Sequence, residues 1–159
     1  MLTQAEVQFK LNYYPDTGIF TRKIRTWKSK PNDVVGSNCN KYIYIGCNGK
    51  QHYAHRLAWL YTYGYWPTVI DHINGDTKDN RLCNLREATL SQNQHNSIMP
   101  KNNTSGIKGV YFHKASQKWM ARVHINYKCI YLGLFDNIED AKNIVINARK
   151  EIHQDFARD

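Results

Sequence analysis

The sequence has no long apolar run, and this absence excludes several classes of protein. None of its stretches approaches the ~20 consecutive apolar residues that a membrane-spanning helix needs. The first residues, MLTQAEVQFK, lack the charged and apolar regions of a secretory signal peptide. Internal repeats and low-complexity segments are absent as well. We therefore expect a cytoplasmic protein without a membrane partner.

The sequence also lacks the cysteine patterns of metal-binding and disulfide-rich domains. Its four cysteines, at positions 39, 47, 83 and 129, form no Cys-x-x-Cys pair and no Cys–His pattern with zinc-finger spacing. We interpret them as reduced thiols. A structural zinc held by Cys39, Cys47 and histidines is the alternative.

Acidic residues are scarce relative to basic ones. The 159 residues include 22 Lys plus Arg and 13 Asp plus Glu, which gives a net charge of +9 and suggests an acidic partner. Apolar residues make up 42% of the chain and aromatic residues 13%, too many for a disordered basic tail. The length allows one domain or two small ones, and a large multidomain enzyme is excluded.

The positive charge is concentrated in two blocks. Residues 22–56 carry one acid, Asp33, and residues 106–133 carry none. A solvated surface with uneven charge is one interpretation, but two basic blocks fit surfaces that track phosphates better. The candidate contacts of the first block are Arg22, Lys23, Arg25, Lys28 and Lys30.

Local patterns predict the elements of the first part of the chain. YIYIGCNGKQHYAH alternates around Asn48-Gly49, which predicts a β-hairpin with a two-residue turn. HRLAWLYTYGYWP predicts a short helix that ends at Gly64. Three segments follow: VIDHI is predicted as a strand, GDTKDN as a loop and NLREATLSQNQHN as a helix.

The polar, aperiodic stretch that contains Pro100 predicts a linker between two domains. We place a first domain at 1–97, the linker at 98–105 and a second domain at 106–159. In the second domain, GVYFH, KWMARVHI and CIYLGLF predict three strands, and IEDAKNIVINARKEIHQ predicts a helix. The fold class is α+β, and its last part is a three-stranded antiparallel sheet packed on one helix.

Residues 71–96 contain the side chains that phosphodiester hydrolysis requires. The reaction needs a base to activate water and a divalent cation to neutralise developing charge. His72 offers a base and Asp71 a cation ligand. An amide oxygen would hold the imidazole in one tautomer, and Asn84 and Asn80 are the candidates. Asn93 or Asn96 could supply a further oxygen ligand to the cation held by Asp71. Oxygen ligands suit Mg²⁺ or Mn²⁺.

Each of these residues also has a structural interpretation. Asp71 and His72 could form an ordinary hydrogen-bonded pair, and Asn84 could cap the helix predicted after it. Asn93 and Asn96 could be solvated side chains. Spacing alone does not decide between these interpretations and a catalytic site.

The segment HRLAWLYTYGYWPTVIDHINGDTKDNRLCNLREATLSQNQHN resembles the HNH endonucleases of phage and intron-encoded type. DHINGD, DNR and NLR occur in order over residues 55–96. The resemblance implies a ββα-metal fold that binds one divalent cation and cuts DNA. It further implies that Asp71 ligates the metal, His72 is the general base, Asn84 orients His72 and Asn93 supplies the second ligand. In some relatives the last position is histidine, which leaves His95 and Asn96 as alternatives.

The second domain has the alternation of a sheet that faces DNA on one side. In KWMARVHI, one parity carries Lys118, Met120, Arg122 and His124, and the other would face the helix. The segment from residue 105 to 157 resembles the APETALA2/ERF-type DNA-binding domain through GVYFHK, KWMARV, YLGLF and the DAKN helix. The DNA contacts that this resemblance implies are Tyr111, His113, Lys114, Lys118, Trp119, Arg122 and His124.

These observations predict a site-specific DNA endonuclease of the homing type whose sheet domain binds flanking DNA. Its partner is double-stranded DNA, its cofactor one Mg²⁺ or Mn²⁺, and a monomer suffices. If the gene is phage-encoded, the location is the host cytoplasm. Two rival hypotheses remain: a DNA-binding regulator in which the HNH-like part is only a scaffold, and an RNA-binding or RNA-cleaving protein.

Overall fold

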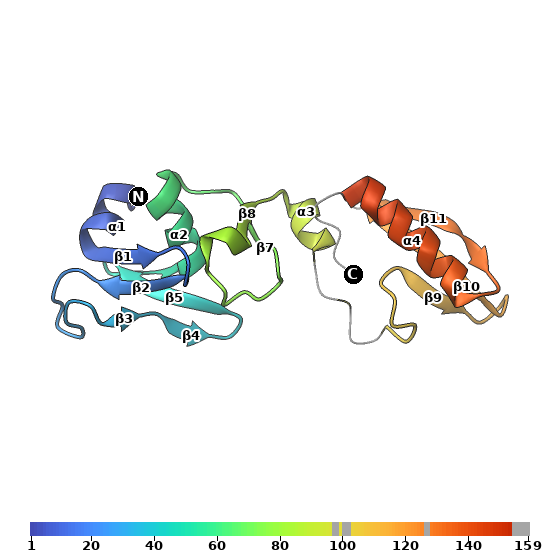
Figure 1. The fold of residues 1–159 in the computed structure, drawn as a ribbon, viewed down its shortest axis with the longest axis horizontal. Coiled ribbons are helices and arrows are strands. Elements are labelled where there is room, and N and C mark those ends of the chain that lie inside the picture. The colour runs from blue at the N-terminus through green and yellow to red at the C-terminus, as the bar shows by residue number, and fades with distance from the viewer. Residues whose placement is uncertain (97–98, 100–102, 126–127, 154–159) are drawn as a thin grey trace. The chain divides into compact units, whose positions relative to one another are not determined.

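In a computed structural model the chain forms two compact units, Met1–Ala88 and Thr89–Asp159, and each is described by itself. The structure describes residues 1–96, 99, 103–125 and 128–153 (Figure 1). Within this part of the chain, no helix combines the length and the apolarity needed to cross a membrane. The units divide before the helix at 90–95, whereas the sequence places the boundary at 98–105. Positions 98 and 100–102 of that predicted linker lie outside the described residues.

The first unit combines helices with small antiparallel sheets. Strand order is β1-β2-β3 in one sheet, β4-β5-β6 in a second and β7-β8 in a third. In chain order its elements are α1 (Gln4–Lys10), β1 (Leu11–Tyr14), β2 (Ile19–Arg22), β3 (Val34–Val35), β4 (Ser37–Cys39), β5 (Tyr42–Cys47), β6 (Lys50–Tyr53), α2 (Ala54–Tyr63), β7 (Ile70–His72), the 3-10 turn η1 (Leu82–Asn84) and β8 (Leu85–Glu87).

Helices α1 and α2 enclose the core of this unit. The sequence analysis does not anticipate α1, although Thr3 and Glu6 form a reciprocal capping box that defines its start. The α1 side chain of Gln8 donates to the carbonyl of Tyr61 at the end of α2, over 2.9 Å. The buried apolar side chains of the core include Val7, Leu11, Phe20, Ile45, Leu57, Leu60, Ile70 and Leu85.

The predicted hairpin and the helix after it are confirmed. Cys47 pairs with Lys50, and the two turn residues Asn48 and Gly49 have φ of 50° and 73°, as a type I′ turn requires. Helix α2 ends at Gly64, whose left-handed conformation lets its N–H bond the carbonyl of Leu60.

The helix predicted over residues 84–96 is wrong in its first part. Leu85–Glu87 is instead strand β8, which pairs antiparallel with β7 and buries Leu85. Helix α3 spans only Leu90–His95. Thr89 and Gln92 explain its late start, because each side chain bonds the other's backbone N–H in a capping box. Pairing with β7 therefore decides the structure of residues 85–87, in spite of their helical spacing.

The second unit confirms the predicted sheet on a helix. Its strands β9 (Val110–His113), β10 (Lys118–Ile125) and β11 (Lys128–Phe135) form an antiparallel sheet in the order β11-β10-β9. Ala121 of β10 is buried with Ala141 and Val145 of α4 (Ile138–His153), and Val123 of β10 is buried as well. The parity predicted for KWMARVHI is therefore observed.

The β1–β2 hairpin supports the 73–81 loop that joins β7 to η1. The hydroxyl of Tyr13 donates to the carbonyl of Asn80 over 2.8 Å, and the N–H of Leu82 donates to the carbonyl of Pro15 over 2.9 Å. Gly18 in the hairpin turn has a φ of +71°, and a Cβ there would lie 2.5 Å from the carbonyl carbon of Asn80. Only glycine allows this close approach of two backbones.

Replacing Gly18 with alanine should therefore push the 73–81 loop away and destabilise the first unit. We expect the free energy of unfolding to fall by about 2 to 4 kcal/mol, from the left-handed conformation and the backbone clash together. Gly49→Ala is the matched control, because Gly49 has a φ of +73° but open space around it. It should cost about 1 kcal/mol. Urea unfolding measures both, and equal losses for the two variants would contradict this account.

Candidate functional site around His72

Asp71 and His72 lie side by side at the end of strand β7, and both are buried. The strand ends there because the N–H of Gly75 turns back to the carbonyl of His72 over 2.8 Å. Neighbouring side chains on a strand point to opposite faces, so the two groups have different surroundings. Asp71 meets β8, and His72 meets aromatic side chains from β5 and α2.

The carboxylate of Asp71 pairs with Arg86, its cross-strand neighbour. Both Nε and Nη2 of Arg86 lie 2.8 Å from Oδ2 of Asp71. A buried carboxylate needs a partner of this kind, since unpaired charge is costly in the protein interior. The sequence analysis did not assign a role to Arg86, although it lies within the NLR motif.

Two aromatic rings lie next to the imidazole of His72. The ring centroid of His55, at the start of α2, lies 5.0 Å away in an edge-to-face arrangement, and that of Tyr42 lies 6.3 Å away. His55 itself stacks on Tyr53. His55 was missed as a candidate, although it shares the buried α2 face with Ala58 and Trp59, three and four residues on.

Burial keeps both imidazoles neutral near pH 7. It lowers the pKa of His55 to about 3, with smaller electrostatic contributions from the neighbouring His72 and Arg56. Burial also lowers the pKa of His72, while a hydrogen bond with the Asn80 side chain and the nearby Asp71 carboxylate act in the opposite direction. A neutral imidazole can accept a proton, so His72 has the protonation state that a general base needs.

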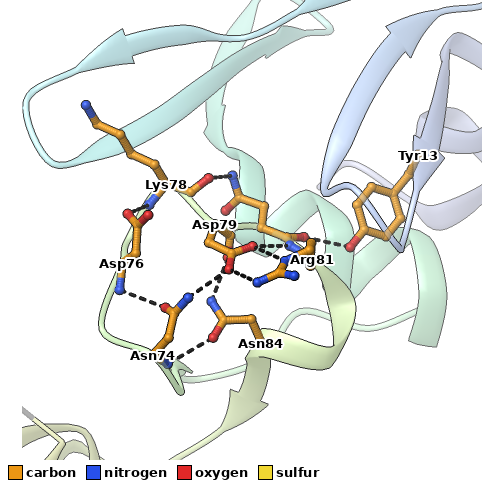
Figure 2. A network of polar contacts seen from close by, with 8 residues as sticks. Tyr13, Asn74, Asp76, Lys78, Asp79, Arg81 and Asn84 are labelled. Carbon is orange, nitrogen blue, oxygen red and sulfur yellow. Dashed lines mark hydrogen bonds and ion pairs between the residues drawn. The ribbon is translucent and has the colours of Figure 1, made fainter.

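The side chain of Asn84 holds the 73–81 loop from both ends (Figure 2). Its Oδ1 accepts from the N–H of Asn74 over 2.9 Å, and its Nδ2 donates to the carbonyl of Asp79 over 2.8 Å. These contacts give the carboxamide of Asn84 a role in loop structure. Its predicted role in orienting His72 stays a prediction.

The Asp79 carboxylate completes this network. It accepts from Arg81 through Nε and Nη2, at 2.8 and 2.6 Å, and from the side chain of Asn74 at 2.8 Å (Figure 2). The bonds from Arg81 hold the pKa of Asp79 at about 2. The loop is therefore anchored by an ionised carboxylate under all physiological conditions.

Asn80 is the alternative orienting residue, and the structure places it beside His72. Its side chain is buried, its Nδ2 donates to the carbonyl of Lys78, and its hydrogen bond with His72 affects the pKa of that imidazole. The Oδ1 of Asn80 has no well-aligned partner among the described residues. A long or poorly aligned contact to His72 fits both observations, as is common before substrate binds.

The predicted second metal ligand belongs to the other unit. Asn93 is exposed on α3, Asn96 is buried just after it, and the side chain of His95 lies outside the described residues. Asp71 is in the first unit, so its pairing with Asn93 stays a prediction. No cluster of three or more His, Cys, Asp or Glu side chains suited to a metal ion occurs in the part of the chain that the structure describes.

The five basic residues predicted to bind DNA in the first block differ in their surroundings. The side chain of Arg22 donates to the carbonyl of Gly46, and that of Lys23 donates to the carbonyl of Gln8. Both side chains therefore stabilise the fold of the first unit. The other three, Arg25, Lys28 and Lys30, are exposed.

On the sheet of the second unit, most of the predicted contact residues are at least partly exposed. Arg122 lies over the ring of Tyr111, 4.2 Å from its centroid, and Lys118 forms an ion pair with Asp136. Trp119 packs against the apolar cluster under the sheet. Lys114 and His124 are exposed, and His113 contacts the hydroxyl of Ser116.

Comparisons with known proteins bear on the same region. A profile of the HNH endonuclease family matches residues 52–95, which include Asp71, His72 and Asn84. The chain is also similar to Protein 3.8 of Escherichia phage T7, with 37% identity over 95 residues that cover 60% of this chain and 75% of that protein. No solved structure matches the chain.

The buried neutral His55 should make the first unit sensitive to acid. Its pKa is about 3 in the folded state and about 6.5 in the unfolded state, so the unfolded chain binds more protons between these values. Stability is thus complete above pH 6.5 and falls as the pH drops towards 3. Between pH 7 and pH 5 we expect a loss of about 2 kcal/mol from His55.

Urea unfolding followed by tryptophan fluorescence measures this loss. His55→Gln is the control, because it removes the titrating group and should reduce the pH dependence by the same amount. If the stability of His55→Gln depended on pH as strongly as that of the native chain, His55 would not be a buried neutral group.

Proposed function

The chain belongs to the family of Protein 3.8 of Escherichia phage T7 and matches the HNH endonuclease model at residues 52–95, and on this basis we propose that it is a site-specific DNA endonuclease of the homing type. It hydrolyses phosphodiester bonds with one divalent cation and a histidine general base. The observation that carries the proposal is the buried pair at the end of β7, Asp71 and His72, which lies inside the family match at 52–95.

His72 is the proposed base of the reaction. Its neutral imidazole takes a proton from a water molecule, whose oxygen forms a bond to phosphorus as the bond to the 3′ oxygen breaks. The 3′ oxygen takes a proton from a solvent water molecule, so the products are a 5′ phosphate and a 3′ hydroxyl. His72 then returns its proton to solvent. Asn84 fixes the 73–81 loop behind the imidazole, and either Asn84 or Asn80 sets its orientation.

The donors present fit a hard divalent cation, with Mg²⁺ preferred over Mn²⁺. Asp71 contributes a carboxylate and Asn93 an amide oxygen, and Mg²⁺ commonly binds to one or two carboxylates together with waters and substrate phosphates. When bound, the cation stabilises the negative charge that develops on the 3′ oxygen. The ββα-metal fold is part of this proposal and rests on the family match at residues 52–95. Arg86 holds Asp71 in place for its role as a ligand.

The second unit is proposed to bind flanking double-stranded DNA in the manner of an APETALA2/ERF-like domain. Support comes from the three-stranded sheet, where His124 on β10 and Lys114 in the turn after β9 are exposed, and from the helix packed on the sheet. Phosphate contacts are expected to dominate, because Arg122 is the only arginine on these strands. A single active site per chain would nick DNA as a monomer, and the phage relative supports action in the host cytoplasm.

Cleavage of supercoiled plasmid DNA tests the proposal. With Mg²⁺ or Mn²⁺ the native chain should nick or linearise the plasmid, and EDTA should stop the reaction. His72→Ala and Asp71→Asn should each reduce cleavage by at least about 100-fold, the lower bound for loss of a general base, while DNA binding is nearly unchanged.

DNA binding in an electrophoretic shift assay is the control for folding. Metal-independent binding without any cut, on DNA that contains the natural target, would favour the regulator hypothesis instead. Loss of DNA binding in a folded His72→Ala protein would show that His72 has a structural role.

A further inference from the structure

The loop between β2 and β3, residues 23–33, is fixed at its base; we call it the Trp27 loop. The N–H of Arg22 donates to the carbonyl of Asp33, and the N–H of Asn32 donates to the carbonyl of Arg22, over 3.0 and 2.7 Å. The N–H of Lys23 adds a bond to the carbonyl of Lys10. The loop therefore leaves the sheet in a defined direction.

The tip of the Trp27 loop is a hydrogen-bonded turn. The N–H of Thr26 donates to the carbonyl of Ser29 over 2.8 Å, and the N–H of Ser29 donates to the hydroxyl of Thr26 over 3.1 Å. These bonds place Trp27 and Lys28 at the two central positions of the turn. A closed turn presents its central side chains with little loss of conformational freedom on binding.

The fold makes no use of the Trp27 side chain. Its exposed fraction is 89%, whereas Trp59 of the same unit is buried and Trp66 packs against the core. The Nζ of Lys28 lies 4.4 Å from the ring centroid on one face of the indole. An indole so exposed is unfavourable in water, which suggests that it contacts a partner.

Charge around the indole indicates the chemistry of that partner. Arg25, Lys28 and Lys30 are exposed on the same loop, and the only acid in it, Asp33, accepts from the backbone N–H of Lys30 over 2.7 Å. Cations track phosphates, while a flat aromatic ring stacks on bases. In duplex DNA, an apolar side chain reaches base faces by entering a base step and partly unstacking it.

We propose that Trp27 is a base-stacking wedge that enters an unstacked step of duplex DNA, while Arg25, Lys28 and Lys30 hold the flanking phosphates. This assignment rests on the proposed function, because duplex DNA is the substrate in both. In addition to contacts with phosphates, the protein would recognise DNA by how easily a base step opens. Flexible steps and damaged or unpaired positions would then bind more tightly.

The test compares two DNA duplexes of about 30 base pairs that are identical except for one central abasic site. Binding of the full chain is measured by fluorescence anisotropy in EDTA, so that no cleavage interferes. The native chain should bind the abasic duplex about tenfold more tightly, in the range of one stacked base. Trp27→Ala should lose this preference, and Trp27→Phe should keep part of it.

Lys28→Ala is the matched control, because it removes a charge from the same turn. It should weaken binding to both duplexes equally and lower the salt dependence by about one phosphate contact. Trp27 is exposed, so its variants should unfold at the same urea concentration as the native chain. An unchanged preference in Trp27→Ala, or an equal loss on both duplexes, would overturn the proposal.

Two further outcomes separate this inference from the nuclease proposal. A Trp27-dependent preference without any metal-dependent cleavage would leave the wedge standing and contradict the nuclease. Metal-dependent cleavage without a Trp27-dependent preference would support the nuclease proposal and overturn the wedge. Trp27-dependent binding to vesicles of anionic lipid, with none to either duplex, would assign the loop to a membrane surface and overturn the proposal.

Discussion

The two hydrogen bonds of the Asn84 carboxamide fix the 73–81 loop, and the surroundings of His72 depend on them. One end of the amide holds Asn74 just after β7, and the other holds Asp79 just before η1. Asp79 in turn binds Arg81. From the outside, the β1–β2 hairpin reaches the same loop at Asn80, through Tyr13 and the close approach of Gly18. The 73–81 loop, which has no regular structure, is thereby held by contacts at both of its ends and at Asn80.

Within this frame, the site combines an ionised group and neutral groups in close proximity. Asp71 forms an ion pair with Arg86, while burial favours the neutral forms of His72 and His55. The overall charge of +9 lies mostly elsewhere, on loops and on the second unit. The positive charges that attract the phosphate backbone thus lie apart from His72. The reaction at one phosphate requires an unprotonated base, and burial keeps His72 in that form.

Much of the fold was predictable because its signals are local. Asn48-Gly49 fixed a hairpin, Gly64 ended α2, and the alternation in KWMARVHI gave the buried face of β10. One failure arose where a contact distant in sequence decides, and two arose because local capping boxes were missed. Residues 85–87 have helical spacing but pair with β7, and the capping box at Thr89 was overlooked. Helix α1 was also overlooked, despite the Thr3 and Glu6 capping box at its start.

The candidate site followed the same division. Asp71, His72 and Asn84 were predicted from their residue types and from the family resemblance, and their roles stay predictions; the structure places them at β7 and in the adjacent η1 turn. The residues that surround and support these groups were not predicted. Arg86, His55 and Gly18 belong to elements whose contacts with one another cannot be read from the sequence. Asn80 and Asn84 could not be separated from sequence, because their roles depend on which backbone groups lie within reach.

The pH dependence of DNA cleavage tests the central claim most directly, that a buried neutral His72 is the general base. The rate, measured with Mg²⁺ on folded protein, should rise through one ionisation below pH 6.5, because burial lowers the pKa of His72, and stay level above it. The residual cleavage of His72→Ala should lack this ionisation. A rate that still rises well above pH 6.5, or the same profile in the variant, would contradict the account.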